Sequence, residues 1–265
     1  MPNGKETKET AEAVELIGKL VEGSVVVDNP TTVLTDYLNH GDDLVRSSAL
    51  DAISVVQGLD KRRAAQAVAL LANDPDSYYR AEGAATLGRL GQPEVTPTLI
   101  DLLVNDPDDL ARAQAAEALG YIGARDAVPT LLAALNDEWD MVRNDAAYAL
   151  GFVGGPEIVE ELLTGHLDNH DDVRAQIVAT VYRIGDSRGL EQLLTLIDSV
   201  ADENLASRVD SVVRGLAQWH QPSSLVADRN RIIESLTAMA ERVPQDKHDI
   251  DRDTKSTIEK LNQLE

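Results

Sequence analysis

Cysteine is absent from this 265-residue chain, and only 3% of its residues are aromatic. Without thiols there are no disulfides, no thiolate metal ligands and no cysteine nucleophile. No apolar run reaches the about 18 residues that a membrane-spanning helix needs. The first residues, Met1 to Lys8, lack the apolar core of a signal peptide. We therefore expect a soluble, cytoplasmic protein without a membrane partner.

Lysine is also scarce, and the chain is strongly acidic. The 24 basic and 46 acidic residues give a net charge of −22, and only seven of the basic residues are lysines. Such a charge repels nucleic acid and anionic lipid, so we expect no nucleic-acid partner. Aspartates (28) outnumber glutamates (18). This composition suits work in high salt, where charge repulsion is screened within a few ångströms. It predicts a halophilic source, whereas full stability and monodispersity in salt-free buffer would indicate an ordinary acidic surface.

An arginine recurs throughout the chain in one local sequence frame. The successive intervals are 34, 32, 31, 31 and 34 residues. The six positions are Arg46, Arg80, Arg112, Arg143, Arg174 and Arg208. A fixed period in this range predicts stacked two-helix units.

The residues around each arginine predict how its helix packs. With the arginine as position 0, apolar or small residues recur at +3, +4, +7 and +10, which in the third unit are Ala115, Ala116, Leu119 and Ile122. This spacing is the period of a helix with one buried face. An Asp or Asn precedes each helix as a candidate N-cap, as at Asp76, Asp108 and Asn204.

Glycines recur at two further positions of the frame. Position +8 is held by Gly88, Gly120 and Gly151. A glycine inside a helix costs about 1 kcal/mol, so its repetition predicts close approach of a neighbouring helix. In the fifth unit Tyr182 replaces it, and we expect this ring in the core. Position +11, held by Gly91, Gly123, Gly154 and Gly185, has the pattern of a helix C-cap.

The signature Val-Arg-x-x-Ala-Ala-x-Ala-Leu-Gly-x-Ile-Gly resembles HEAT repeats of the short subclass named after the phycobilisome lyase subunits. The resemblance covers residues 42–200 and implies an all-α, right-handed solenoid of about six helix pairs with capping helices. Residues 1–41 are then an N-terminal tail with a degenerate capping pair, with helices expected at 8–22 and 30–39. Residues 201–265 are a degenerate repeat followed by C-terminal capping helices, expected at 225–243 and 251–264.

The same resemblance implies a structural role for the six recurring arginines. Each is expected to pair with an aspartate of an adjacent unit, forming a ladder along the stack. Arg112→Ala should then destabilise the fold rather than abolish one activity, because a partly buried ion pair is costly to break from one side.

The outward face of the arginine-bearing helices is the candidate binding surface. Positions −2, +1, +2, +5 and +9 point away from the core, and the resemblance implies that they line the concave side of the solenoid. Four of the nine aromatic residues fall there, with a methionine at −2 and a tryptophan at the rim. Such a patch on a charged protein is typical of a binding site. The candidate partner-binding residues are Tyr78, Arg89, Glu117, Tyr121, Trp139, Met141, Tyr148, Phe152 and Arg183.

Several alternatives for this surface stay open. The aromatic side chains could pack against one another or against a terminal helix, and the patch could bind a second copy of the chain. Arg89 and Arg183 are expected to orient a partner, and they suit an apolar segment with some negative charge.

Nothing in the sequence predicts a catalytic or metal site. Hydroxylases built from this repeat bind iron through His-Glu dipeptides, and the five histidines here include none. Phosphate-binding and nucleophile motifs are also absent. We therefore predict no cofactor and a non-catalytic scaffold or adaptor that binds a protein or peptide segment. The alternative is a lyase-like enzyme or chaperone acting on a chromophore-bearing partner.

Overall fold

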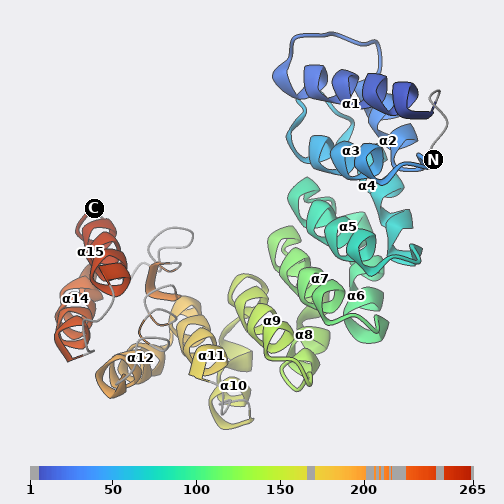
Figure 1. Ribbon diagram of the computed structural model, residues 1–265. Coiled ribbons are helices and arrows are strands. Elements are labelled where there is room, and N and C mark those ends of the chain that lie inside the picture. Colours follow the sequence, from blue (N-terminus) through green and yellow to red (C-terminus); the bar gives the residue numbers. More distant parts are fainter. Residues whose placement is uncertain are drawn as a thin grey trace. The chain divides into compact units, whose positions relative to one another are not determined.

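The computed structural model of the chain describes residues 6–165, 171–200, 225–242 and 248–263, with residues 206, 209, 212–214 and 216 between them. The chain divides into two compact units, residues 1–130 (unit 1) and 131–265 (unit 2). Every regular element in the described ranges is a helix (Figure 1). The predicted all-α repeat fold is therefore confirmed.

Unit 1 consists of successive helix pairs. Its α-helices are α1 Glu6–Glu22, α2 Pro30–Tyr37, α3 Asp43–Val55, α4 Lys61–Val68, α5 Ser77–Leu90, α6 Thr96–Asn105 and α7 Asp109–Ile122. Short 3-10 helices cover Ala69–Asn73, Pro93–Val95 and Arg125–Ala127. The first helix of each pair packs against the first helix of the next, so that α3 contacts α5 and α5 contacts α7. This nearest-neighbour packing is that of a solenoid.

Unit 2 continues the pattern. Helix α8, Val128–Ala134, spans the division between the units, and a 3-10 helix covers Pro156–Ile158. The other helices are α9 Asp140–Val153, α10 Val159–Gly165, α11 Asp171–Ile184, α12 Ser187–Ser199, α14 Leu225–Arg242 and α15 His248–Asn262. Helix α11 packs on α9 and α12, and α12 packs on α14. Helices thus lie where the sequence predicted them at both ends of the chain.

The helix boundaries follow from their capping residues. The carboxylates of Asp76 and Asp108 accept hydrogen bonds from the first-turn amides of Tyr78 and Ala111, at 3.0 and 3.2 Å. Asn204 lies outside the described residues. At the other end, the glycines at +11 close their helices. Gly91, Gly123 and Gly185 have φ of 67°, 75° and 99°, whereas Gly154 caps α9 in an extended conformation with φ −78°. Three of the four predicted C-caps are therefore left-handed.

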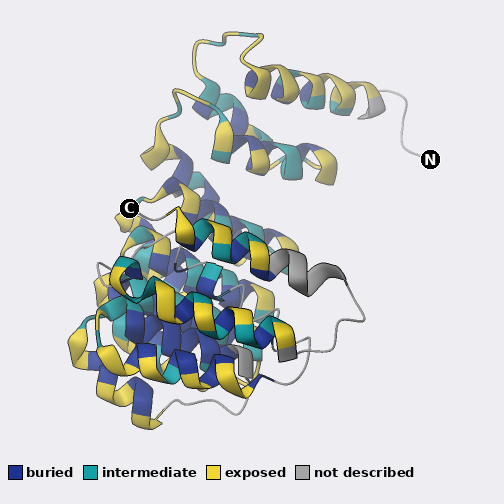
Figure 2. Ribbon diagram, turned by 90° about the vertical axis from the view of Figure 1, so that its left-hand side faces the viewer, coloured by how far each residue is buried: buried dark blue, intermediate teal, exposed yellow. Residues whose placement is uncertain are grey.

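Buried and exposed residues alternate along the helices as the repeat frame predicts (Figure 2). Ala115, Ala116 and Leu119 are fully buried. The prediction for position +1 is wrong, because Ala81 and Ala113 are buried instead of facing outward. The reason is that a first helix such as α5 packs against both of its neighbours, which covers its two flanks as well as its core face.

Glycines set the closest helix contacts. A Cβ added to Gly88 of α5 would lie 2.9 Å from the Cα of Ala118 on α7, so the predicted close approach is real at this position. In unit 2, a Cβ added to Gly189 at the start of α12 would lie 2.6 Å from the Cα of Tyr182 on α11. Contacts this short leave no room for a side chain.

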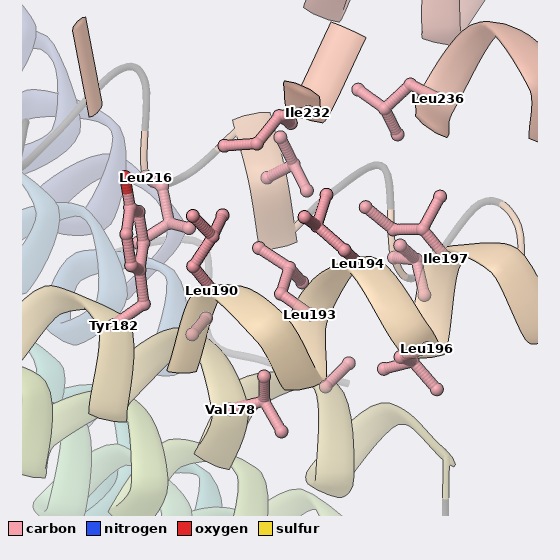
Figure 3. Close-up of a cluster of buried hydrophobic side chains, with 14 of the residues drawn as sticks. Val178, Tyr182, Leu190, Leu193, Leu194, Leu196, Ile197, Leu216, Ile232 and Leu236 are labelled. Atoms are coloured by element: carbon pink, nitrogen blue, oxygen red, sulfur yellow. The ribbon is translucent and has the colours of Figure 1, made fainter. Parts of the chain in front are cut away.

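The core of unit 2 extends to the terminal helices. Leucine and isoleucine side chains of α12 and α14 meet Tyr182 of α11 in one apolar cluster (Figure 3). The Tyr182 ring is buried, as expected, and its hydroxyl donates a hydrogen bond of 2.9 Å to Asp228 on α14. The outward positions Ala179 and Ala206 are buried in the same cluster. In the last repeats the face that is exposed earlier in the chain therefore belongs to the core.

Two of the recurring arginines bind the aspartate that ends the second helix of their own pair. The guanidinium of Arg80 donates two hydrogen bonds of 2.8 Å to the carboxylate of Asp106. Arg46 binds the Asp74 carboxylate through Nη2, its Nε donates to the Leu38 carbonyl at 3.2 Å, and its guanidinium lies 3.7 Å from the centre of the Tyr79 ring. The link from Arg80 to the preceding pair uses the backbone, since its Nη1 donates a hydrogen bond of 3.1 Å to the carbonyl of Asp74. A ladder of side-chain ion pairs between units therefore stays a prediction.

The structure describes the other four arginines of the proposed ladder to different extents. Arg112 and Arg143 are buried. Each donates a hydrogen bond, of 2.9 and 3.0 Å, to the backbone carbonyl of Asp106 and Asp137, respectively, six residues earlier in the sequence. Arg174 is half-buried, and Arg208 lies outside the described residues.

The Arg80–Asp106 pair should make stability depend on pH. Burial alone would raise the pKa of Asp106, but hydrogen bonds from Arg80 and from the Asp108 amide, with the charges of Arg80 and Arg112, lower it below its usual value. A carboxyl group with a lowered pKa in the folded state stabilises the fold above its unfolded pKa, about 3.9. That stability is lost as the pH falls through the lower, folded-state pKa.

We expect Asp106→Asn to be less stable than the wild type at neutral pH, with a difference that shrinks as the pH falls from about 5 to about 3. Urea unfolding at a series of pH values measures this, with Asp198→Asn, an exposed position on α12, as the control. A difference that stays constant over this range would contradict the proposed role of Asp106.

Candidate partner-binding surface

In unit 1, apolar side chains at position −2 are exposed on three contacting helices. Leu44 on α3, Tyr78 on α5 and Leu110 on α7 have exposed fractions of 58%, 49% and 41%. Position −2 is the second residue after the N-cap, so the side chain stands in the first turn of the helix, away from the core face. The prediction that this position faces outward holds in unit 1.

Position +9 contributes a second exposed row on the same three helices. It contains Val55, Arg89 and Tyr121. Arg89 donates hydrogen bonds to two hydroxyl groups of unit 1. Its Nε donates to Ser54 on α3 at 2.9 Å, and its Nη2 donates to Thr86 on α5 at 2.8 Å.

Glu117 and Tyr121 lie one turn apart on α7. The Tyr121 hydroxyl donates a hydrogen bond of 2.9 Å to the Glu117 carboxylate. Both rows and Glu117 together form the unit 1 surface, which we define as Leu44, Val55, Tyr78, Arg89, Leu110, Glu117 and Tyr121.

The surroundings of Tyr78 are acidic. Its pKa is raised, first by partial burial and then by the charges of Glu82, Asp51 and Asp76. Its ring also packs edge-on against Tyr79, with 5.2 Å between the ring centres. The carboxylates of Glu82, Asp51 and Asp76 therefore lie near this ring. A partner that contacts Tyr78 meets these charges, and the expectation of some negative charge on the partner stays a prediction.

In unit 2, Tyr148, Phe152 and Arg183 pack on one another. The two rings on α9 meet edge to face, with 4.8 Å between their centres. The Arg183 guanidinium of α11 lies 5.2 and 5.0 Å from the ring centres of Tyr148 and Phe152. A Cβ added to Gly151 would lie 2.5 Å from Arg183 Nη1, so this glycine makes room for the guanidinium. The rings are only half-exposed, and the anticipated packing of aromatics on their own chain applies here.

The Arg183 guanidinium is largely buried. Burial lowers its pKa, against a smaller opposite effect of Tyr148. Its Nε and Nη1 groups are buried, and no described residue accepts a hydrogen bond from them. Stacking on aromatic faces offsets part of the cost of burying the charge. These contacts join α9 to α11, and the expected role of Arg183 in orienting a partner stays a prediction.

Trp139 and Met141 are the exposed members of the predicted set in unit 2. Their exposed fractions are 50% and 37%. Trp139 is the residue before α9, and its amide donates a hydrogen bond of 3.0 Å to Asp137. The indole is therefore presented at the start of the helix, as the position −4 predicted.

The histidines give no evidence of a common site. His40 accepts a hydrogen bond from the Asp42 amide at 3.0 Å. His166, His170 and His220, and the side chain of His248, lie outside the described residues. Within the described part of the chain, no three His, Asp or Glu side chains gather as metal ligands do. No helix in that part has both the length and the apolar character to cross a membrane.

The repeat frame, the capping residues and the stacked helix pairs agree with a comparison against protein families. A model described as HEAT repeats matches residues 31–119 and 96–183, which together span more than half of the chain. The chain belongs to the HEAT-repeat family. The match starts within α2.

Solved structures show the same HEAT-repeat architecture. The complex of CpcE and CpcF of phycocyanin lyase from Nostoc sp. PCC7120 is similar, with a TM-score of 0.57 and 17% identity over 89% of this chain and 96% of that chain. The Escherichia coli protein YibA has a TM-score of 0.51 and 18% identity over 100% of this chain and 99% of its own. At these identities the similarity concerns the fold. A search of curated protein sequences gives no match.

Proposed function

We propose that this HEAT-repeat protein is a non-catalytic scaffold that binds a protein partner. The partner contacts the unit 1 surface, and Trp139 with Met141 is a separate candidate contact in unit 2. The observation that carries the proposal is the row of Leu44, Tyr78 and Leu110, which stays exposed at equivalent positions of three contacting helices. Aromatic and large aliphatic side chains exposed together are costly in water and favour an interface.

The repeat architecture supports this function. Stacked helix pairs present extended surfaces, and such surfaces suit the binding of other chains. A structure of similar fold contains two different proteins, CpcE and CpcF, in one complex. Arg89 is part of the unit 1 surface, whereas Arg183 packs on aromatic rings of this chain, so the proposed contact is mainly apolar.

The proposal predicts that Tyr78→Ala with Tyr121→Ala weakens partner binding at least about tenfold, since removal of a central interface side chain commonly costs more than about 1 kcal/mol. A native pull-down with tagged protein, at low and at high salt and read by mass spectrometry, identifies the partner. Its affinity for purified wild type and variant is then measured directly.

The matched control is Leu70→Ala with Val104→Ala. These side chains are 70% and 60% exposed, but neither lies on a first helix of a pair. Leu70 is in the 3-10 helix Ala69–Asn73 that continues α4, and Val104 is on α6. A partner that binds this control normally and the tyrosine variant weakly supports the proposal. Equal binding to the tyrosine variant and to the wild type would remove the unit 1 surface from the interface.

One measurement tests the lyase-like or chaperone alternative directly. A chromophore-bearing partner or a bound tetrapyrrole would give the purified complex visible absorbance. A colourless complex with a polypeptide partner favours the scaffold.

A further inference from the structure

An open groove runs between the first helices of the first two pairs in unit 1. It has a volume of about 410 Å³ and is lined by α1 and α3. Ile17 and Ala52 are its buried lining residues, and Val21 and Val55 are exposed at 49% and 56%. The groove therefore offers apolar contacts to another molecule.

Helix α1 follows the repeat frame with Thr10 in place of the arginine. The Thr10 hydroxyl donates a hydrogen bond of 3.2 Å to Asp42, the N-cap residue of α3 in the next pair. Gly18 follows Thr10 by eight residues, which is the spacing from Arg80 to Gly88. Gly18 is therefore the counterpart of the glycines that let neighbouring helices approach closely.

The contact that such a glycine permits is missing at Gly18. A Cβ on Gly88 would lie 2.9 Å from Ala118 Cα, whereas a Cβ on Gly18 would meet no atom within 4 Å. Gly18 lines the groove, inside helix α1, where glycine is unfavourable. No packing neighbour within the described chain accounts for this glycine, and its bare Cα leaves space for atoms of an occupant.

The charges around the groove define the occupant. Glu22 and Asp51 line it, and both are exposed. Of the described residues that line it, none is basic. The nearby Lys19 is bound to Glu15 at 2.6 Å. A second copy of the chain is a poor occupant, because each copy carries a net charge of −22.

We propose that this groove docks a basic, aliphatic peptide segment of a partner protein. An aliphatic side chain lies over Gly18, and a flanking Lys or Arg pairs with Glu22 and Asp51. Asp51 and Val55 are positions +5 and +9 of α3, so the groove continues the unit 1 surface next to Tyr78. The inference rests on the proposed scaffold function and names the chemistry of its partner.

The test starts from peptides instead of a known partner. A phage-displayed library of random dodecapeptides is selected on the full chain at physiological salt, and the enriched peptides are synthesised for fluorescence anisotropy. We expect them to carry Lys or Arg beside Leu, Ile or Val. Their affinity should fall at least about tenfold for Gly18→Leu, which fills the groove, and for Asp51→Lys.

Two variants control for folding and for general charge attraction. Gly18→Ala improves helix propensity as Gly18→Leu does but fills less space, so it should lose less affinity. Asp198→Lys makes the same charge change at an exposed position of α12 and should bind as the wild type does. Circular dichroism checks that each variant is folded.

The groove proposal would be overturned if no peptides were enriched, or if the enriched peptides were acidic or uncharged. It would also be overturned if Gly18→Leu bound the peptides as the wild type does, or if Asp51→Lys and Asp198→Lys lost equal affinity. The pull-down with the Tyr78 and Tyr121 variant is independent of these results. If the tyrosine variant loses its partner but peptide binding does not depend on the groove, the scaffold function stands and this docking site does not.

Discussion

Arg80→Met should lower the free energy of unfolding by about 3–5 kcal/mol, which is the usual cost of leaving one member of a buried ion pair behind. The Arg80 side chain is 12% exposed and that of Asp106 is 3% exposed, so water cannot replace the lost hydrogen bonds. Urea unfolding followed by circular dichroism measures the change.

The matched control is Arg62→Met. Arg62 binds Glu94 at 3.3 Å, but the two side chains are 68% and 47% exposed, and exposed pairs contribute about 1 kcal/mol or less. The double variant Arg80→Met with Asp106→Asn should regain part of the loss, because it removes the stranded charge. Equal losses in Arg80→Met and Arg62→Met would show that the Arg80 pair does not stabilise the stack.

Gly189→Ala should destabilise unit 2 by about 3 kcal/mol, at the upper end of the cost of overpacking. The added Cβ would meet the backbone of α11 at Tyr182, so α11 and α12 must separate. That separation disturbs the apolar cluster that α12 and α14 share with Tyr182. Thermal unfolding and hydrogen exchange of α11 and α12 measure the effect.

Gly18→Ala is the control for Gly189→Ala, because its Cβ meets no atom within 4 Å. It should raise stability by up to about 1 kcal/mol, the difference in helix propensity between the two residues. Comparable stability of the two variants would mean that the close approach at Gly189 is not constrained.

The repeat period and the core face could be read from sequence because each unit repeats the same packing problem. Leu119 and its counterparts Leu87 and Leu150 lie at +7 and are all buried. The outward face was harder to predict, since exposure depends on which helix lies next to it. Ala113 is covered by a neighbouring helix, and Ala179 joins the cluster formed with the terminal helices.

The candidate site could be predicted only in part for a related reason. Tyr78, Tyr121 and Trp139 are exposed as their positions indicate. Phe152 packs against Arg183, a contact between different repeats that no local pattern contains. The groove beside Gly18 was missed because Thr10 breaks the arginine signature of its repeat. The groove could have been found by searching for a glycine at +8 while accepting polar residues other than arginine at position 0.

Asp106, which ends α6, joins that helix to both α5 and α7. Its carboxylate accepts two hydrogen bonds from Arg80 on α5 and one of 2.9 Å from the Asp108 amide before α7, while its backbone carbonyl accepts one from Arg112 on α7. Opening the α5–α6 pair at this point therefore also breaks contacts with α7. Single pairs in unit 1 should therefore not fray one at a time, and mechanical pulling on this part of the chain should release several pairs in one step.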